Sequence, residues 1–276
     1  MGGEVIQTGK NGCRKASVRH MNPRIEEHPS PNYDQRARAI DLVVLHYTGM
    51  HAARTALKRL RDPAPLAGHY PGPWQSADTP SDTRLGRASA HYVVDERGVI
   101  FRLVGEHLRA WHAGVSSWEG EGDVNSRSIG IEIVNGGHDF DLPEFPLVQV
   151  DAVIVLLHQI LQRWELHPSR VVAHSDIAPG RKRDPGEKFP WQRLAQAGAS
   201  IWPDTSGVEV GAEADIALVQ QQLRAFGYGI GETGAQDEQT RLVLEAFQRR
   251  FRPARIDGVA DDETRRLLAA LTIAKA

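Results

Sequence analysis

The sequence has a single cysteine, Cys13, in 276 residues, so no internal disulfide can form. This suits a reducing compartment without excluding the periplasm. The sequence also lacks an excess of charge of one sign, because 33 Lys and Arg against 35 Asp and Glu give a net charge of −2. That balance does not fit a polyanion partner, and we expect no nucleic acid to bind. The residues before Cys13 lack the apolar core of a secretory signal, and Met21 is an alternative initiator.

An uninterrupted apolar run of about 20 residues, which a membrane span requires, is missing as well. The longest apolar stretch, residues 146–164, contains Gln149, Asp151 and His158, and it indicates a buried helix. We therefore expect no membrane span. We further expect a monomer located in the cytoplasm, with the periplasm or cell wall, reached by an unrecognised route, as the alternative.

The composition, with 41% hydrophobic and 25% charged residues, is typical of a soluble globular protein. A chain of this length can bury a large core without the support of disulfides or structural metals. Residues 1–37 are polar and rich in proline near their end, and they predict a flexible segment. Residues 38–200 alternate strand and helix patterns and form the larger expected domain. Residues 201–212 have linker composition, and residues 213–276 carry three short amphipathic segments.

The alternation of patterns predicts an α/β fold with a mixed central sheet flanked by helices, followed by a small three-helix all-α domain. Apolar or alternating runs predict strands at residues 39–48, 128–135 and 171–174 and a hairpin at 90–104. Helical periodicity and breakers predict helices at residues 52–62, 147–165 and 189–198, and a loop at 63–84.

The densest polar chemistry lies in HSDIAPGRKRDPG, residues 174–186, directly after an apolar strand. His46 ends one predicted strand, His174 ends another, and Asp184 lies in the loop that follows. Two imidazoles and a carboxylate are a common ligand set for Zn²⁺, and three protein ligands leave a fourth position for water, as in catalytic sites. The alternative is that these are surface histidines or histidines satisfied by structural hydrogen bonds.

Two further side chains are candidates for the chemistry. Glu132 shares one face of its predicted strand with Gly130 and Val134, and a carboxylate there is costly to bury without partners. It is either half of a buried salt bridge or a general base with a raised pKa. Lys182 lies two residues before Asp184 and could stabilise an oxyanion, or it could be a solvated charge in a basic run.

Five stretches together resemble the zinc-dependent N-acetylmuramoyl-L-alanine amidases of the type-2 amidase family, which share a fold with peptidoglycan recognition proteins. These stretches are VVLHYTG, SAHYVVDERGVIFRLV, AWHAGVSSWEG, SIGIEIVN and HSDIAPGRKRDPG, and the resemblance covers about residues 38 to 200. The tail beyond residue 213 is similar to the three-helix peptidoglycan-binding domain that is often fused to hydrolases.

The resemblance implies that zinc is bound by His46, His174 and Asp184, and that the substrate is the amide between N-acetylmuramic acid, or its anhydro form, and L-alanine. It implies that Glu132 is the catalytic acid/base and that Lys182 stabilises the transition state. We also place three side chains in the substrate groove, and we expect His91 to support the site; the groove residues are Tyr47, Trp111 and His112.

The implied role is peptidoglycan turnover or muropeptide recycling. Two alternatives remain at this point: a recognition protein that binds peptidoglycan without cleaving it, and a zinc hydrolase of another cell-wall amide.

Overall fold

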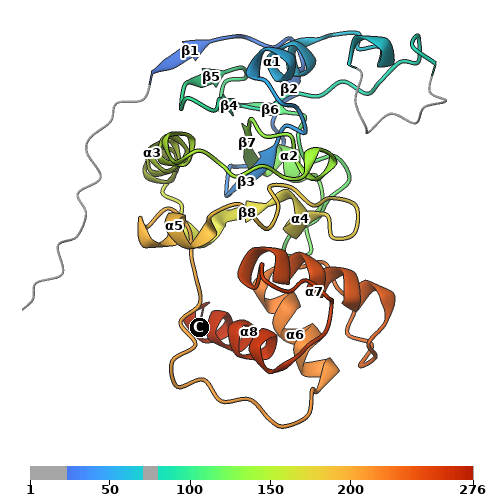
Figure 1. Cartoon of the computed structure of the whole chain (residues 1–276), viewed down its shortest axis with the longest axis vertical. Coiled ribbons are helices and arrows are strands. Elements are labelled where there is room, and N and C mark those ends of the chain that lie inside the picture. Colours follow the sequence, from blue (N-terminus) through green and yellow to red (C-terminus); the bar gives the residue numbers. More distant parts are fainter. Residues whose placement is uncertain (1–23, 71–79, 276) are drawn as a thin grey trace, which may run out of the picture.

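The computed structural model describes residues 24–70 and 80–275. Its centre is a six-stranded mixed sheet with helices on both faces (Figure 1). A separate antiparallel pair is formed by β2 (Tyr33–Gln35) and β6 (Leu108–Ala110). In spatial order the main sheet contains β1 (Ile25–Glu27), β5 (Ile100–Arg102), β4 (Tyr92–Val94), β7 (Ser128–Ile133), β3 (Leu42–Tyr47) and β8 (Val171–Ala173).

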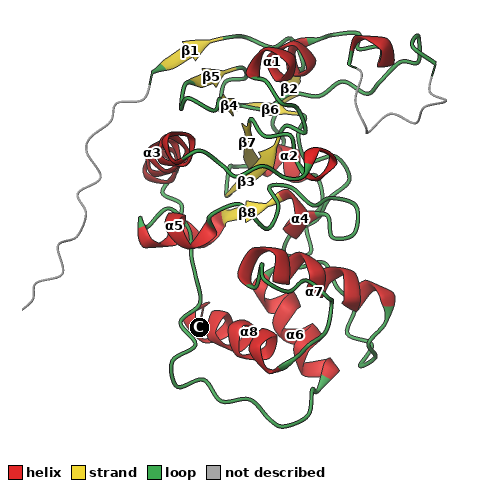
Figure 2. Ribbon diagram, viewed as in Figure 1, coloured by secondary structure: helices red, strands yellow, loops and turns green. Residues whose placement is uncertain are grey.

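Helices alternate with these strands as far as residue 196 and then follow one another without strands (Figure 2). The helices of the first part are α1 (Ala53–Arg61), α2 (Val124–Arg127), α3 (Leu147–Arg163), α4 (His174–Ile177) and α5 (Trp191–Gln196). Those of the second part are α6 (Ile216–Phe226), α7 (Glu238–Phe251) and α8 (Asp262–Lys275). Single 3₁₀ turns lie at Ala67–His69, His138–Phe140 and Pro168–Arg170. The predicted fold class is confirmed.

One face of the sheet packs against α3. On β7 the side chains of Ile129, Ile131 and Ile133 enter this core, because alternate residues of a strand point to the same side. Val43 and Leu45 do so from β3. The helix contributes a continuous apolar surface that is buried over most of its length, so the charged and amide residues that interrupt its sequence do not prevent burial.

The other face of the sheet packs against two hydrophobic clusters. Near α1, a small cluster contains Leu57, Leu60 and Val93. Near β8, Leu42 and Val44 pack in one core with residues of all three C-terminal helices, including Val219, Phe247 and Leu268. The C-terminal helices are therefore not an independent body, since their core is continuous with that of the sheet.

The prediction of a flexible segment at residues 1–37 does not hold for residues 24–37. Strand β1 instead pairs in parallel with β5, and Arg36 donates to the carbonyl oxygens of Glu106 at 2.7 Å and Ser128 at 2.8 Å. These contacts come from residues far along the chain, which no local pattern could indicate. The rest of that prediction, residues 1–23, lies outside the described residues.

Within the described ranges, no helix combines the length and the hydrophobicity that crossing a bilayer requires.

Candidate active site

Three neighbouring parallel strands bring the candidate residues together. His46 is the penultimate residue of β3 and is directly paired in register with Glu132 on β7. On the other side of β3 lies β8, and His174 follows its last residue as the first residue of α4. The loop after α4 returns Asp184 to the same place. The carboxyl ends of parallel strands thus form one site, as is usual in α/β sheets.

The ligand atoms of the three predicted metal residues converge. Nδ1 of His46 lies 2.9 Å from Nδ1 of His174 and 3.0 Å from Oδ2 of Asp184. Nδ1 of His174 lies 2.9 Å from the same carboxylate oxygen. All three residues are buried. Their spacing fits a small cation coordinated by all three atoms.

The hydrogen bond made by Nε2 of His174, the ring nitrogen that points away from His46 and Asp184, fixes the tautomer of this histidine. Its Nε2 lies 3.1 Å from the carbonyl oxygen of Ala113. A carbonyl can only accept, so Nε2 carries the proton and Nδ1 keeps its lone pair. Such a second contact is the usual companion of a metal-ligating histidine.

A longer chain of hydrogen bonds fixes His46 in the same way. The Ser128 hydroxyl donates to the carbonyl of Val124 at 2.6 Å, so it accepts from Nε2 of His112 at 3.3 Å. Nδ1 of His112 is then an acceptor, and Nε2 of His46 donates to it at 3.0 Å. Nδ1 of His46 is consequently left with a lone pair that faces His174 and Asp184.

Electrostatics favour the protonation states that a metal needs. Burial, reinforced by the neighbouring His174, lowers the pKa of His46 to about 4. Burial works against ionisation of Asp184, but His174 and His46 together hold the pKa of its carboxyl far below the ordinary range. Neutral imidazoles and an ionised carboxylate are the ligand forms for Zn²⁺. The residues therefore fit a bound divalent cation.

Glu132 forms no salt bridge with any residue that the structure describes. One of its oxygens, Oε2, is buried without a hydrogen-bond partner among the described residues, and the side chain is only partly exposed toward the cleft. Burial, and then the charge of Asp184, raises the pKa of this carboxyl to about 8. A buried carboxyl that is left unpaired beside a metal-type ligand set is available to a reacting molecule.

Lys182 lines the same cleft, which has a volume of about 490 Å³. Its ammonium makes no ion pair within 4.0 Å among the residues that the structure describes. Because its charge lowers the pKa of both His46 and Glu132, it acts electrostatically on the site. The basic neighbour Arg183 lies 3.8 Å from Asp139, and both side chains are exposed.

The three residues predicted to contact substrate all line the cleft, but they differ in what holds them. The Tyr47 hydroxyl lies 3.0 Å from Nδ1 of His138. The ring of Trp111 lies 4.7 Å below the Arg87 guanidinium. His112 is bonded to His46 and so supports a candidate ligand from behind, besides lining the cleft.

The position of His112 depends on a glycine. A Cβ atom on Gly130 would lie 2.4 Å from Cγ of His112, so the ring occupies the space that any other residue would fill. The backbone nitrogen of Gly130 donates to Nδ1 of His91 at 2.9 Å. His91 is fully buried. Its contacts match the supporting position expected for it.

Two further residues near the site, Arg181 and His138, connect the loops that surround it. Arg181 donates to the carbonyls of Ala113 at 2.8 Å and Val115 at 2.5 Å, and so joins the loop before Asp184 to the loop behind His174. His138 bridges Tyr47 to Glu187, whose carboxylate lies 2.9 Å from Nε2 of His138. Neither contact has a local signal in the sequence.

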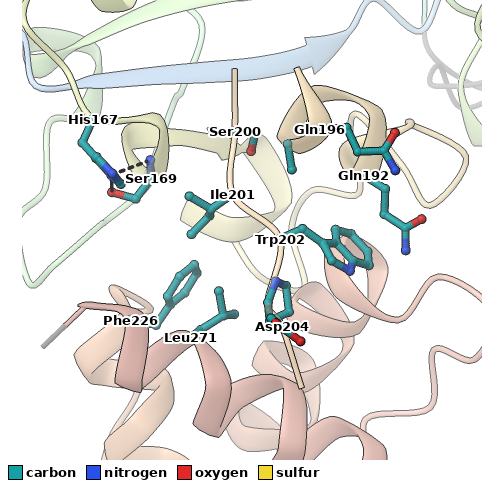
Figure 3. A pocket seen from close by; sticks show the side chains of 12 residues that line it. His167, Ser169, Gln192, Gln196, Ser200, Ile201, Trp202, Asp204, Phe226 and Leu271 are labelled. Carbon is teal, nitrogen blue, oxygen red and sulfur yellow. Dashed lines mark hydrogen bonds between the residues drawn. The ribbon is translucent and has the colours of Figure 1, made fainter. Parts of the chain in front are cut away.

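A second and larger cavity of about 910 Å³ lies where the C-terminal helices meet the sheet domain. Figure 3 shows its lining, with Phe226 and Leu271 from the C-terminal helices facing Ile201 and Trp202 of the connecting segment. The metal-type group formed by His46, His174 and Asp184 lies in the smaller cleft, and we therefore assign the chemistry to that cleft.

A mixed sheet with this group of residues at its carboxyl edge defines an α/β protein whose site could hold a metal ion. The family profile described as N-acetylmuramoyl-L-alanine amidase matches residues 36–187, and one described as a putative peptidoglycan binding domain matches residues 212–268. The chain belongs to the N-acetylmuramoyl-L-alanine amidase family, its curated relatives are amidases, and the predicted resemblance is confirmed.

Individual relatives agree. The chain is 38% identical over 204 residues to the N-acetylmuramoyl-L-alanine amidase AmiD of Escherichia coli. This alignment covers 67% of the present chain and 74% of AmiD. A solved complex of E. coli AmiD with anhydro-N-acetylmuramic acid-L-Ala-D-γ-Glu-L-Lys superposes with a TM-score of 0.69 at 33% identity, over 86% of this chain and 91% of that one. AmpDh3 of Pseudomonas aeruginosa in complex with an anhydromuramic pentapeptide gives a TM-score of 0.72 at 35% identity, over 86% and 93%.

Proposed function

We propose that this protein hydrolyses the amide between N-acetylmuramic acid, in particular its anhydro form, and the L-alanine of peptidoglycan-derived muropeptides. The observation that supports this proposal most strongly is the unpaired carboxyl of Glu132 next to the converging ligand atoms of His46, His174 and Asp184. Family membership supports the reaction, and the two anhydromuramyl ligands in the related structures support the sugar form.

In this proposal His46, His174 and Asp184 hold a zinc ion. When bound, the ion supplies Lewis-acid polarisation of the amide carbonyl and makes water more acidic. The chain contributes the ligand geometry, because the Ala113 carbonyl and His112 fix the two imidazole tautomers.

Glu132 is the proton carrier. Its carboxylate accepts a proton from the attacking water, whose oxygen forms a bond to the carbonyl carbon. As the carbon–nitrogen bond breaks, Glu132 returns that proton to the departing nitrogen, which leaves as the free amine of L-alanine. A pKa near the operating pH favours both transfers, and that of Glu132 is raised to about 8.

Lys182 carries the positive charge that stabilises the oxyanion formed on the carbonyl oxygen. Its lack of an ion pair among the described residues leaves the ammonium available for this purpose. Tyr47 and Trp111 line the cleft on the substrate side. The C-terminal helices hold the enzyme near polymeric wall, which raises the local substrate concentration.

Mass analysis of digested muropeptides tests the proposal. Incubation with a purified anhydro-muropeptide should yield free anhydro-N-acetylmuramic acid and a peptide with a new L-alanine amino terminus. Cleavage within the peptide would instead indicate another amide as substrate, and an unchanged muropeptide, with folded and zinc-loaded protein, would indicate a binding protein.

A further inference from the structure

Helix α7 of the C-terminal domain lies against the segment that carries two of the candidate ligands. Figure 1 shows α7 next to α4, the short helix that begins with His174. Further along this segment, a Cβ atom on Gly180 would lie only 2.8 Å from Cδ1 of Leu242 on α7. The C-terminal domain thus packs closely on the loop that leads from His174 to Asp184.

A fully buried ion pair crosses this contact. Arg250 on α7 donates through Nη1 to Oδ2 of Asp176 at 2.8 Å, and neither side chain is exposed. The guanidinium also donates through Nη2 to the carbonyl of Val171 at 3.0 Å and lies 4.3 Å from the ring centre of Trp191. Arg250 therefore joins the C-terminal domain to β8, α4 and α5 at one point.

The second oxygen of the same carboxylate is held from the C-terminal domain as well. The Tyr228 hydroxyl donates to Oδ1 of Asp176 at 2.7 Å. Tyr228 itself is buried and packs with Trp118 of the sheet domain, with ring centres 5.3 Å apart. Two donors from one domain thus fix the orientation of a single carboxylate in the other.

Asp176 is two residues beyond His174 and is coupled to it through the backbone. Its Oδ2 accepts from the nitrogen of Ala173 at 2.8 Å, so the carboxylate closes a ring around His174. Helix α4 has only four residues, too few to be stable without outside contacts. A buried ion pair contributes little net stability, but it fixes geometry. The position of His174 therefore depends on what holds Asp176.

We propose that Arg250 and Tyr228 are positioning residues for the metal centre, which they support through Asp176 and His174. The C-terminal domain is then a structural part of the active site in addition to any role in binding the wall. This inference rests on the proposed function of His174 as a metal ligand.

The experiment compares substitutions at two buried arginines in the full-length protein, one within α7 and one directly after its last residue. Arg250→Met removes the contact with Asp176. Arg252→Met is the matched control, because Arg252 is equally buried but pairs with Asp257 and Asp261 inside the C-terminal domain. Zinc affinity is measured by competition with a chromophoric chelator, the Co²⁺ derivative by its visible spectrum, and kcat and KM on a soluble anhydro-muropeptide at saturating zinc.

We expect Arg250→Met to weaken zinc binding by about 10–100-fold, the range found for residues that support metal ligands, and to change the Co²⁺ spectrum. We expect kcat to fall while KM stays near that of the wild type. Arg252→Met should leave affinity, spectrum and kcat unchanged. If Arg250→Met does not fold, Tyr228→Phe, which loses one hydroxyl, should shift zinc affinity in the same direction by less.

The inference would be overturned if Arg250→Met folds and has the zinc affinity and kcat of the wild type. If only Tyr228→Phe folds, the same result in that variant would overturn it. So would an equal loss in Arg252→Met, because the effect would then come from general destabilisation. A wild-type protein that binds zinc but cleaves no muropeptide would count against the proposed function alone, since the affinity comparison does not depend on turnover.

Discussion

Replacing Glu132 by Gln should stabilise the metal-free protein and should strongly reduce the activity of the zinc-loaded protein. The carboxyl has an ordinary pKa of 4.5, which the fold raises to about 8 because of burial and the charge of Asp184. The folded state therefore keeps a proton that the unfolded chain has released, and stability falls as pH rises from 4.5 to 8. From these two pKa values, Glu132 lowers the free energy of unfolding by about 1 kcal/mol at pH 5 and by about 3 kcal/mol at pH 7, relative to acidic pH where it is protonated in both states. Glutamine has nearly the same shape and no such titration.

The assay is chemical denaturation of chelator-treated wild type and Glu132→Gln between pH 5 and pH 8. Chelation matters because a bound cation would itself favour the ionised carboxylate. The advantage of the variant in free energy of unfolding should grow with pH by about 2 kcal/mol between pH 5 and pH 7. Its zinc-loaded form should lose about 10²–10⁴-fold in kcat, as expected when a general acid/base is removed. Parallel stability profiles for the two proteins would refute the reasoning about this carboxyl.

Two other substitutions test the surroundings of the metal. Lys182→Ala should retain zinc and lose about 10²–10³-fold in kcat, the usual effect of removing an oxyanion donor; near-normal turnover would rule out that role. Gly130→Ala would place a Cβ atom 2.4 Å from the His112 ring and displace it from His46, so kcat or zinc affinity should fall about tenfold or more. The control is Gly86→Ala, whose added atom would meet nothing within 4 Å; equal losses in both variants would contradict the explanation.

The parts of the fold with strong local patterns could be predicted from the sequence. The apolar runs of β3 and β7 and the long periodic segment of α3 all lie where they were expected. Strands β1, β2 and β6 could not be predicted, because each has three residues, IEE, YDQ and LRA, without an apolar alternation. They exist because their backbones pair with residues distant in the sequence.

The candidate site follows the same division. His46 and His174 are recognisable because each lies at the end of an apolar strand, and neighbouring parallel strands bring such ends together. The support of the site is not recognisable: Arg250 and Asp176 are 74 residues apart, and nothing local links them. The amphipathic pattern predicted the three C-terminal helices, but it could not indicate that their core is continuous with that of the sheet.

The metal content of the purified protein tests the central claim most directly. We predict that wild-type protein binds a stoichiometric amount of zinc, measured by elemental analysis after dialysis, and that Asp184→Ala does not retain it. Folded wild-type protein that contains no zinc and takes none up, or Asp184→Ala with the full zinc content, would contradict the assignment of His46, His174 and Asp184.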